Sequence, residues 1–335
     1  MRVCDWIAQY LMSIGVERVH GLMGGGAAGL NDGFIKQGMP YVCYHHEQGA
    51  GHAAIGESKY TGKLAVVNPT TGCAGTNCAT SVLNAWQDSV PVLFISGNVK
   101  LSTCSGWINS QTTGLNIRKY GIQEHHIVDT YRSMTKYSKF ITSVNDVAHE
   151  LSYAIHCATT NRPGPVWIDI PGDIQLATIE NPSVYRPLAD LSLVRPLTTI
   201  KNRIMQSQRP LVLAGYGIRQ ANCVDEFVKF IETYNIPFVS TYGARDYTAN
   251  DHALSIGAVG QRGSRAGNFA MQNADCLILL GTSLGASVVG YDPKQFSPHS
   301  YKIAIDIDNN ELHKNIVDID EQHHLSLPNF FKAML

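Results

Sequence analysis

The chain has 335 residues, of which 44% are hydrophobic and 16% charged, so it has enough apolar material for two domains of ordinary size. Its 26 basic and 27 acidic residues give a formal net charge of -1, which favours neither nucleic acid nor a membrane surface as a partner. The eight cysteines form no C-x-x-C pair and several lie in apolar runs, which predicts buried free thiols and a cytoplasmic, reducing location.

The first part of the chain alternates between predicted helices and strands. A helix over 3–14 has apolar residues at helical spacing, but Asp5 and Gln9 interrupt it, unlike the core of a secretion signal, and no membrane-spanning segment is predicted. The next predicted elements are strands at 19–22, up to 44, at 64–68, 91–96 and 165–170, and helices after the glycines at 24–26, at 76–88 and at 144–159. This alternation predicts a parallel sheet covered on both faces.

The segment 181–196 has three prolines and no periodicity, which predicts an extended linker. Alternation then resumes, with strands predicted at 211–214, 237–240, 276–280 and 302–306 and helices at 224–234 and 265–273. The predicted fold class is therefore α/β, with two parallel-sheet three-layer domains at residues 1–180 and 197–335.

One glycine motif is compatible with a nicotinamide-dependent (NAD) oxidoreductase. Residues 24–29 read GGGAAG, which fits G-x-G-x-x-G after a strand, and Glu47 follows at about the 20-residue distance of a ribose-binding acid. The pattern is short and common, however, and Glu47 begins a predicted helix where this fingerprint requires the end of a second strand.

A second motif permits a serine hydrolase. Residues 281–285 read GTSLG, which fits G-x-S-x-G after a strand, and Asp306 and His323 follow Ser283 in the order of an α/β-hydrolase triad. A Gly-Thr-Ser loop after a strand is also common turn chemistry, which weakens this interpretation.

A third possibility is a metal site formed by His45, His46, His52 and Glu47. The spacing is not that of the H-E-x-x-H helix, and adjacent residues on a strand point to opposite faces. We therefore predict no metal ligands in this chain.

Several further segments occur in order along nearly the whole chain. They are HEQ at 46–48, YTGK at 60–63, TTGCAGTN at 70–77, AWQDSVP at 85–91, IQE at 122–124, RPGPV at 162–166, RPLVLAG at 209–215, MQNADCLI at 271–278 and IDID at 305–308. Together they resemble thiamine-diphosphate enzymes of the acetolactate synthase type. The resemblance implies a pyrimidine-binding domain followed by a Rossmann-like central domain.

The resemblance also implies roles for particular residues. In the family, the glutamate of the HEQ segment, here Glu47, hydrogen-bonds ring nitrogen N1′ of the aminopyrimidine and thereby supports formation of the nucleophilic ylide. Gln123 lies where the family has a glutamine that faces the thiazolium and the substrate. The implied cofactor-binding residues are Glu47, Gly24, Gly25, Thr71, Gly72 and Asn77.

The sequence departs from the family pattern at several positions. Residues 73–74 read Cys-Ala in place of Pro-Gly, Met23 stands where a proline is usual, and Ile122 replaces a frequent phenylalanine, so we expect a different substrate pocket. Residues 281–285 also differ from the typical flavin-binding segment, which argues against bound FAD.

The largest departure concerns the Gly-Asp-Gly segment that holds Mg²⁺ and the diphosphate in family members. We find no such segment here, so the resemblance implies half a cofactor site, completed by a C-terminal diphosphate-binding domain or a separate chain. We expect a lyase or transferase that decarboxylates or carboligates 2-oxo acids as a homodimer or tetramer, inactive as the isolated chain. The alternatives are a non-catalytic binding or regulatory homologue and an NAD-dependent oxidoreductase.

Overall fold

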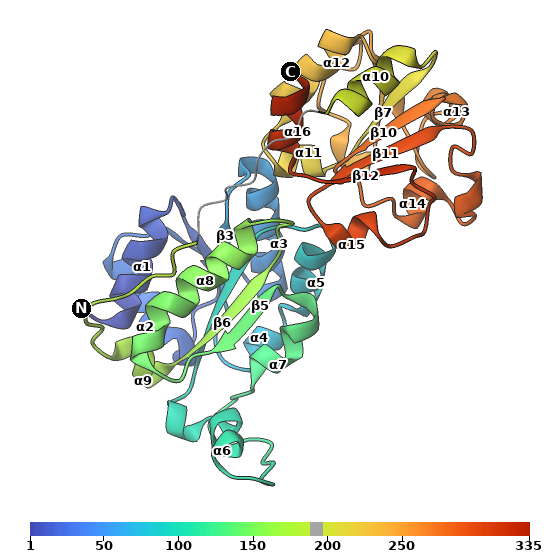
Figure 1. Cartoon of the computed structure of the whole chain (residues 1–335). Coiled ribbons are helices and arrows are strands. Elements are labelled where there is room, and N and C mark those ends of the chain that lie inside the picture. Colours follow the sequence, from blue (N-terminus) through green and yellow to red (C-terminus); the bar gives the residue numbers. More distant parts are fainter. Residues whose placement is uncertain (188–196) are drawn as a thin grey trace. The chain divides into compact units, whose positions relative to one another are not determined.

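The computed structural model of the protein describes residues 1–187 and 197–335 (Figure 1). The chain divides into two units, Met1–Ala189 and Asp190–Leu335. The predicted domain limits at 180 and 197 stay predictions, and most of the predicted linker at 181–196 lies outside the described residues.

The first unit is built on a sheet of six parallel strands in the order β2-β1-β3-β4-β6-β5. The strands are β1 (Val19–Gly21), β2 (Tyr41–Cys43), β3 (Ala65–Asn68), β4 (Val92–Asn98), β5 (Tyr137–Phe140) and β6 (Val166–Pro171). The α-helices are α1 (Val3–Ser13), α2 (Ala28–Lys36), α3 (Glu47–Thr61), α4 (Cys73–Thr76), α5 (Ala79–Gln87), α6 (Ser105–Gln111), α7 (Ile127–Tyr131), α8 (Val147–Thr159) and α9 (Gly172–Leu176).

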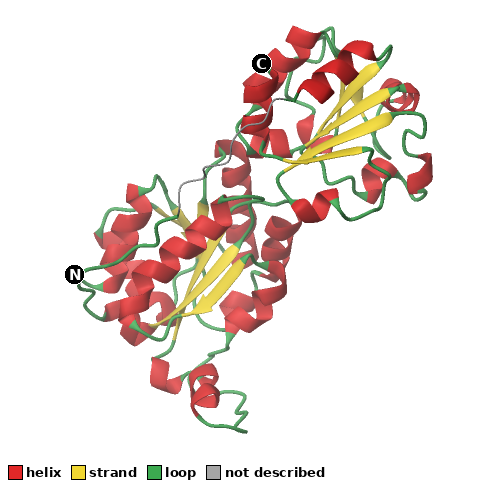
Figure 2. Cartoon of the chain, in the orientation of Figure 1, coloured by secondary structure: helices red, strands yellow, loops and turns green. Residues whose placement is uncertain are grey.

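Helices cover both faces of this sheet (Figure 2). Along β4, Leu93 and Ile95 pack in the core that α1, α2 and α8 close, whereas Val92 and Phe94 pack in the core that α3, α5 and α7 close. This alternation follows from the two-residue period of a strand, and it explains why β4 is apolar through most of its length.

The second unit has the same architecture, with a parallel sheet in the order β12-β11-β10-β7-β8-β9. Its strands are β7 (Pro210–Ala214), β8 (Phe238–Ser240), β9 (Ser255–Ala258), β10 (Cys276–Leu280), β11 (Tyr301–Asp306) and β12 (Glu321–His324). Its α-helices are α10 (Thr198–Gln206), α11 (Gly217–Gln220), α12 (Val224–Tyr234), α13 (Arg265–Asn273), α14 (Ala286–Val289), α15 (Asn309–Leu312) and α16 (Leu327–Met334). The predicted α/β class with two three-layer domains is confirmed.

Two details differ from the sequence-based expectations. The helix predicted over 76–88 is observed as α5, and a separate short helix, α4, precedes it with Asn77 as its C-cap. Cys43 and Cys73 are exposed rather than buried, because Cys43 ends the edge strand β2 and Cys73 begins α4 at the end of the sheet. The other cysteines are buried or half-buried, and all eight are free.

No helix in the described parts of the chain combines the length and the apolar character needed to cross a membrane.

Candidate cofactor site

The candidate site lies at the carboxyl edge of the first sheet. The strands β2, β1, β3 and β4 are parallel, so the loops that follow them meet at this edge. The strand order reverses between β1 and β3, and open α/β sheets bind ligands in the crevice at such a reversal. The glycine loop follows β1, and the loop with Thr71 and Gly72 follows β3.

Glu47 is held at this edge by the start of α3. His46 is the N-cap of the helix, and its Nδ1 accepts a hydrogen bond from the backbone N–H of Gln48 at 3.1 Å. Capping is thus the role of His46, while Glu47 occupies the first turn with only 8% of its surface exposed. A carboxylate near a helix N-terminus is stabilised by the helix dipole.

Asn77 fixes the Glu47 side chain. The Nδ2 of Asn77 donates a hydrogen bond to Oε2 of Glu47 at 2.9 Å, although 30 residues separate the two in the sequence. Among the described residues Oε1 of Glu47 receives no hydrogen bond, so one oxygen remains to accept from a ligand. Two of the residues that the sequence singled out are therefore in direct contact.

Gly72 and Gln123 form a second contact between predicted site residues. Gly72 has a φ of +43°, and a Cβ at this position would overlap the carbonyl oxygen of Gln123. Only glycine combines that backbone conformation with so close an approach. Gln123 itself lies in the left-handed region with a φ of 56°, and its side chain is exposed.

The glycine loop packs directly on the loop that follows β3. A Cβ on Gly24 would lie 2.5 Å from Cγ2 of Thr70, and one on Gly26 would overlap Oγ1 of Thr71. At Gly25, in contrast, a Cβ would have no atom within 4 Å. Close packing between the two loops therefore accounts for Gly24 and Gly26, and Gly25 is the position with space for another molecule.

A buried polar network lies between β4 and β6 near the same edge. Asp169 of β6 accepts hydrogen bonds from Oγ of Ser96 at 2.7 Å and from Nδ2 of Asn98 at 2.8 Å. The pKa of Asp169 is raised to about 7, mainly because the carboxyl group is buried. The two hydrogen bonds lower the pKa, and the negative charge of Glu124 raises it; both effects are included in this value. No sequence motif marks this network, and its only signal in the sequence is the presence of three polar residues inside two buried strands: Ser96, Asn98 and Asp169.

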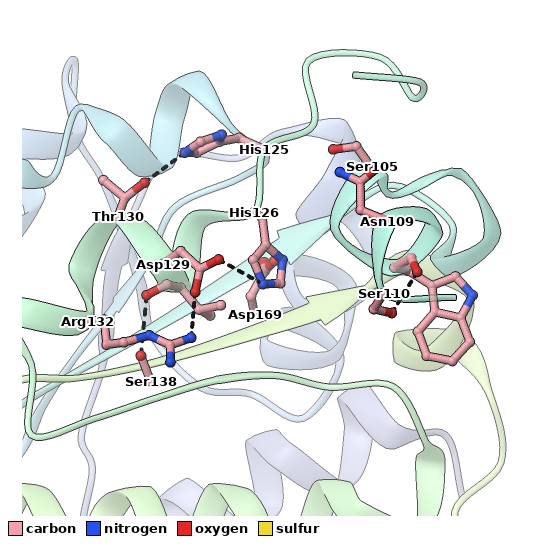
Figure 3. A network of polar contacts seen from close by, with 12 residues as sticks. Ser105, Asn109, Ser110, His125, His126, Asp129, Thr130, Arg132, Ser138 and Asp169 are labelled. Atoms are coloured by element: carbon pink, nitrogen blue, oxygen red, sulfur yellow. Dashed lines mark hydrogen bonds and ion pairs between the residues drawn. The ribbon is translucent and has the colours of Figure 1, made fainter. Parts of the chain in front are cut away.

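The segment that leads from Gln123 into α7 carries two histidines (Figure 3). Nε2 of His125 forms a hydrogen bond with Oγ1 of Thr130 at 2.7 Å. Nε2 of His126 lies 3.5 Å from a carboxylate oxygen of Asp129, and burial lowers the pKa of His126. The charged groups of Asp129 and Arg132 pair with each other on the same short helix segment.

The hydrolase triad suggested by the sequence does not assemble. Nε2 of His323 is 2.7 Å from Oε1 of Glu321, and the hydroxyl of Ser283 has no hydrogen bond in the described part of the chain. The described residues also contain no group of three metal-ligating side chains, and His46 serves as a helix cap.

Comparison with known proteins identifies the family. Residues 1–130 match the model of the thiamine pyrophosphate enzyme N-terminal TPP binding domain, and residues 197–326 match the model of the thiamine pyrophosphate enzyme central domain. The chain therefore belongs to the thiamine pyrophosphate enzymes, as the sequence resemblance predicted. This membership removes the basis for interpreting residues 24–29 as a nicotinamide fingerprint.

The similar proteins include several acetolactate synthase large subunits. The chain is 34% identical over 315 residues to the acetolactate synthase large subunit of Lactococcus lactis, covering 92% of this chain and 52% of that protein. It is 30% identical over 344 aligned positions to the isozyme 2 large subunit of Escherichia coli, covering 100% of this chain and 58% of that protein. A probable large subunit of Methanocaldococcus jannaschii is 30% identical over 325 residues, or 94% of this chain and 53% of that protein. The chain thus spans about half the length of these relatives.

The structural fit to thiamine diphosphate can be judged from Glu47 and Gly25. Glu47 offers a buried carboxylate with one oxygen already oriented by Asn77 and one oxygen without a donor. Gly25 adds open space at the end of β1, across the strand-order reversal from Gly72. The residues present are therefore compatible with an aminopyrimidine ring that carries a proton on its nitrogen.

Proposed function

We propose that this chain supplies the pyrimidine-binding half of a thiamine diphosphate site in an acetolactate synthase-like enzyme. The observation that carries the proposal is the buried Glu47 carboxylate, oriented by Asn77 at the carboxyl edge of the sheet. Its substrates would be 2-oxo acids, decarboxylated or joined to an acceptor, as the names of the relatives suggest. The overall reaction would make it a lyase or transferase.

Each proposed site residue has a distinct task. Glu47 would hold a proton between its free Oε1 and the ring nitrogen of the aminopyrimidine, and Asn77 would keep that carboxylate in place. Thr71 and Gly72, with Gly24 and Gly25 across the crevice, would shape the space around the ring. When bound, thiamine diphosphate supplies the electron sink on which a 2-oxo acid loses CO₂.

Gln123 would contact the substrate. Its exposed side-chain amide offers both a donor and an acceptor, and the carbonyl and carboxylate oxygens of a 2-oxo acid are acceptors. Gly72 permits this position, because it lets the backbone of Gln123 approach the loop that follows β3.

The diphosphate end of the cofactor and its Mg²⁺ would be held by a separate diphosphate-binding domain, in the same or another chain. Mg²⁺ binds oxygen ligands together with phosphate groups, and most affinity for a charged cofactor comes from that end. We therefore expect the 335-residue chain alone to bind thiamine diphosphate weakly and to be inactive. FAD is not part of the proposal.

We further propose a homodimer or tetramer in the cytoplasm. Met23 and Ile122 are 51% and 80% exposed in loops beside the candidate site, and association with a second copy would remove such apolar side chains from water. The free cysteines agree with a reducing compartment. Sedimentation velocity at micromolar concentration should show at least a dimer, and a strictly monomeric protein would contradict the proposal.

The direct test is turnover of 2-oxo acids by the protein combined with a diphosphate-binding domain, thiamine diphosphate and Mg²⁺. Release of CO₂ that requires all of these components would support the proposed function. Tight cofactor binding without turnover would instead support the non-catalytic binding or regulatory homologue.

A further inference from the structure

Gln123 has an unusual backbone conformation that neighbouring residues must maintain. It is a non-glycine residue with a φ of 56°, and residues in this region are kept there by the structure around them. Its side chain is exposed, so burial of that side chain does not hold it in place. The next residue, Glu124, is different: only 6% of it is exposed.

The Glu124 carboxylate connects the two segments on either side of the loop. Oε1 accepts a hydrogen bond from the backbone N–H of Tyr120 at 2.9 Å, and Oε2 accepts one from the hydroxyl of Ser105 at 2.9 Å. Ser105, which is labelled in Figure 3, is the first residue of α6, whereas Tyr120 lies three residues before Gln123. Both carboxylate oxygens are therefore used within the loop.

Backbone contacts tighten the same arrangement. The N–H of Gly121 donates to the carbonyl oxygen of Thr103 at 2.9 Å, and the side-chain amide of Asn98 approaches the carbonyl oxygen of His125 at 3.4 Å. A Cβ on Gly72 would lie 3.4 Å from the carbonyl carbon of Glu124 as well as overlapping Gln123. Residues 123–124 thus pack against Gly72 on one side, and Glu124 is hydrogen-bonded to α6 on the other.

Burial of the Glu124 carboxylate in this loop has a free-energy cost. No cation pairs with Glu124 in the described part of the chain, and burial of an unpaired charge is unfavourable unless hydrogen bonds compensate for it. Its charge also opposes ionisation of the buried Asp169 nearby. A neutral amide would avoid both costs, but only the carboxylate offers an acceptor oxygen to each of the two donors.

We propose that Glu124 is the positioning residue of Gln123, holding its backbone in the left-handed conformation so that its side chain projects toward the 2-oxo acid. This inference rests on the proposed function, because Gln123 has a substrate to face only if that function holds. Glu124 acts through Gln123 and does not itself touch the substrate.

A double-mutant cycle with Glu124→Gln and Gln123→Ala tests the proposal. The measurement is kcat/KM for the 2-oxo acid, with the diphosphate-binding domain supplied, together with the Kd for thiamine diphosphate. Glu124→Gln should lower kcat/KM about tenfold and leave the cofactor Kd unchanged, because a neutral amide offers only one acceptor oxygen for two donors. In the Gln123→Ala background the same change should cost less than about twofold, because coupled residues are not additive.

Additive losses, or a weakened cofactor Kd, would overturn the proposal in favour of a merely structural role for Glu124. Ser105→Ala should give a smaller loss, and Ser105→Thr should keep wild-type kcat/KM because it retains the hydroxyl.

Hydrogen exchange of the Tyr120 amide tests the loop without requiring turnover. This amide should be protected in the wild type and in Gln123→Ala, and unprotected in Glu124→Ala, which removes both acceptor oxygens. Protection that persists in folded Glu124→Ala would overturn the proposal. If the wild type turns over no 2-oxo acid, the proposed function fails, and the exchange measurement then decides alone whether Glu124 holds the loop.

Discussion

Nδ2 of Asn77 donates a hydrogen bond to Oε2 of Glu47 at 2.9 Å, across the carboxyl edge of a parallel sheet. Asn77 is the C-cap of α4 and lies in the two-residue connection between α4 and α5. The hydrogen bond leaves a single oxygen of the buried carboxylate for a ligand, which is the arrangement that the proposed proton sharing requires.

Asn77→Ala should therefore reduce the rate at which the C2 proton of bound thiamine diphosphate exchanges with solvent. A hydrogen bond to a charged group contributes about 1.5–3 kcal/mol, so we expect a loss of about 10- to 100-fold. The lost hydrogen bond should also lower the melting temperature by a few degrees, so exchange is compared at a temperature at which both proteins are folded. The matched control is Asn84→Ala, which removes an amide-to-carboxylate bond to Asp88 on α5; an equal loss in this control would contradict the role of Asn77.

Gly72→Ala should destabilise the protein, whereas Gly25→Ala should not. At Gly72 the methyl group meets the carbonyl oxygen of Gln123 and the backbone is in the left-handed region, so we expect a loss of about 1–3 kcal/mol or more in the free energy of unfolding. At Gly25 the methyl group enters open space, and the change should stay within about 1 kcal/mol. Urea denaturation measures both.

The Gly25→Ala variant also tests the proposed cofactor surface. Its methyl group would occupy the space next to the aminopyrimidine, so thiamine diphosphate should bind more weakly although the fold is unchanged. Unchanged affinity in this variant would remove Gly25 from the proposed site.

Asp169→Asn should flatten the pH dependence of stability. The pKa of Asp169 is about 7 in the folded protein, whereas the ordinary value for an aspartate is 3.8. Between these two pH values the folded state therefore retains a proton that the unfolded state has released. Its stabilising contribution is present below about pH 4 and is lost as the pH rises to about 7, with a slope of up to about 1.4 kcal/mol per pH unit.

Urea denaturation at pH 5, 6, 7 and 8 should show that Asp169→Asn loses about 1–3 kcal/mol less stability than the wild type between pH 5 and 7. The prediction concerns this slope, because the substitution also changes the bonds to Ser96 and Asn98. Asp173→Asn is the control, since that carboxylate is exposed. Parallel curves for the wild type and Asp169→Asn would show that Asp169 is not the titrating group.

Ser283→Ala should be silent in both activity and stability. The serine is exposed, its hydroxyl has no partner among the described residues, and His323 pairs with Glu321. Surface substitutions of this kind change stability by about 0.5 kcal/mol or less. Loss of 2-oxo acid turnover in this variant would contradict the prediction, because it would show that Ser283 contributes to activity.

The sequence predicted the central strands because they are apolar on both faces, and β4 and β10 were found within two residues of their limits. It did not predict the edge strands β5, β9 and β12. An edge strand pairs on one side only, and β12 reads EQHH with alternate residues exposed, so hydrophobic periodicity is absent. The sequence also placed the start of the helix α5 three residues early, at Thr76, because neither glycine nor proline separates Thr76 from Ala79.

For the site, the sequence supplied the residues but not their contacts. Glu47 and Asn77 were identified by family resemblance, yet their hydrogen bond joins the first turn of α3 to the C-cap of α4, and no local pattern encodes it. The glycines at 24–26 fit a dinucleotide-binding motif as well as they fit the thiamine-diphosphate family. A local pattern shows that glycine is needed at a position, but it does not show the reason. The tertiary structure shows that Gly24 and Gly26 fit against Thr70 and Thr71.

The central claim is that Glu47 shares a proton with the aminopyrimidine of thiamine diphosphate. Glu47→Gln tests it most directly, because the amide can still form a hydrogen bond but cannot accept the shared proton. With a diphosphate-binding domain supplied, exchange of the cofactor C2 proton is followed by NMR in the wild type and the variant. We predict that Glu47→Gln slows this exchange by about 10²- to 10⁴-fold while leaving the melting temperature close to that of the wild type. Wild-type exchange in the Glu47→Gln protein would contradict the assignment of Glu47.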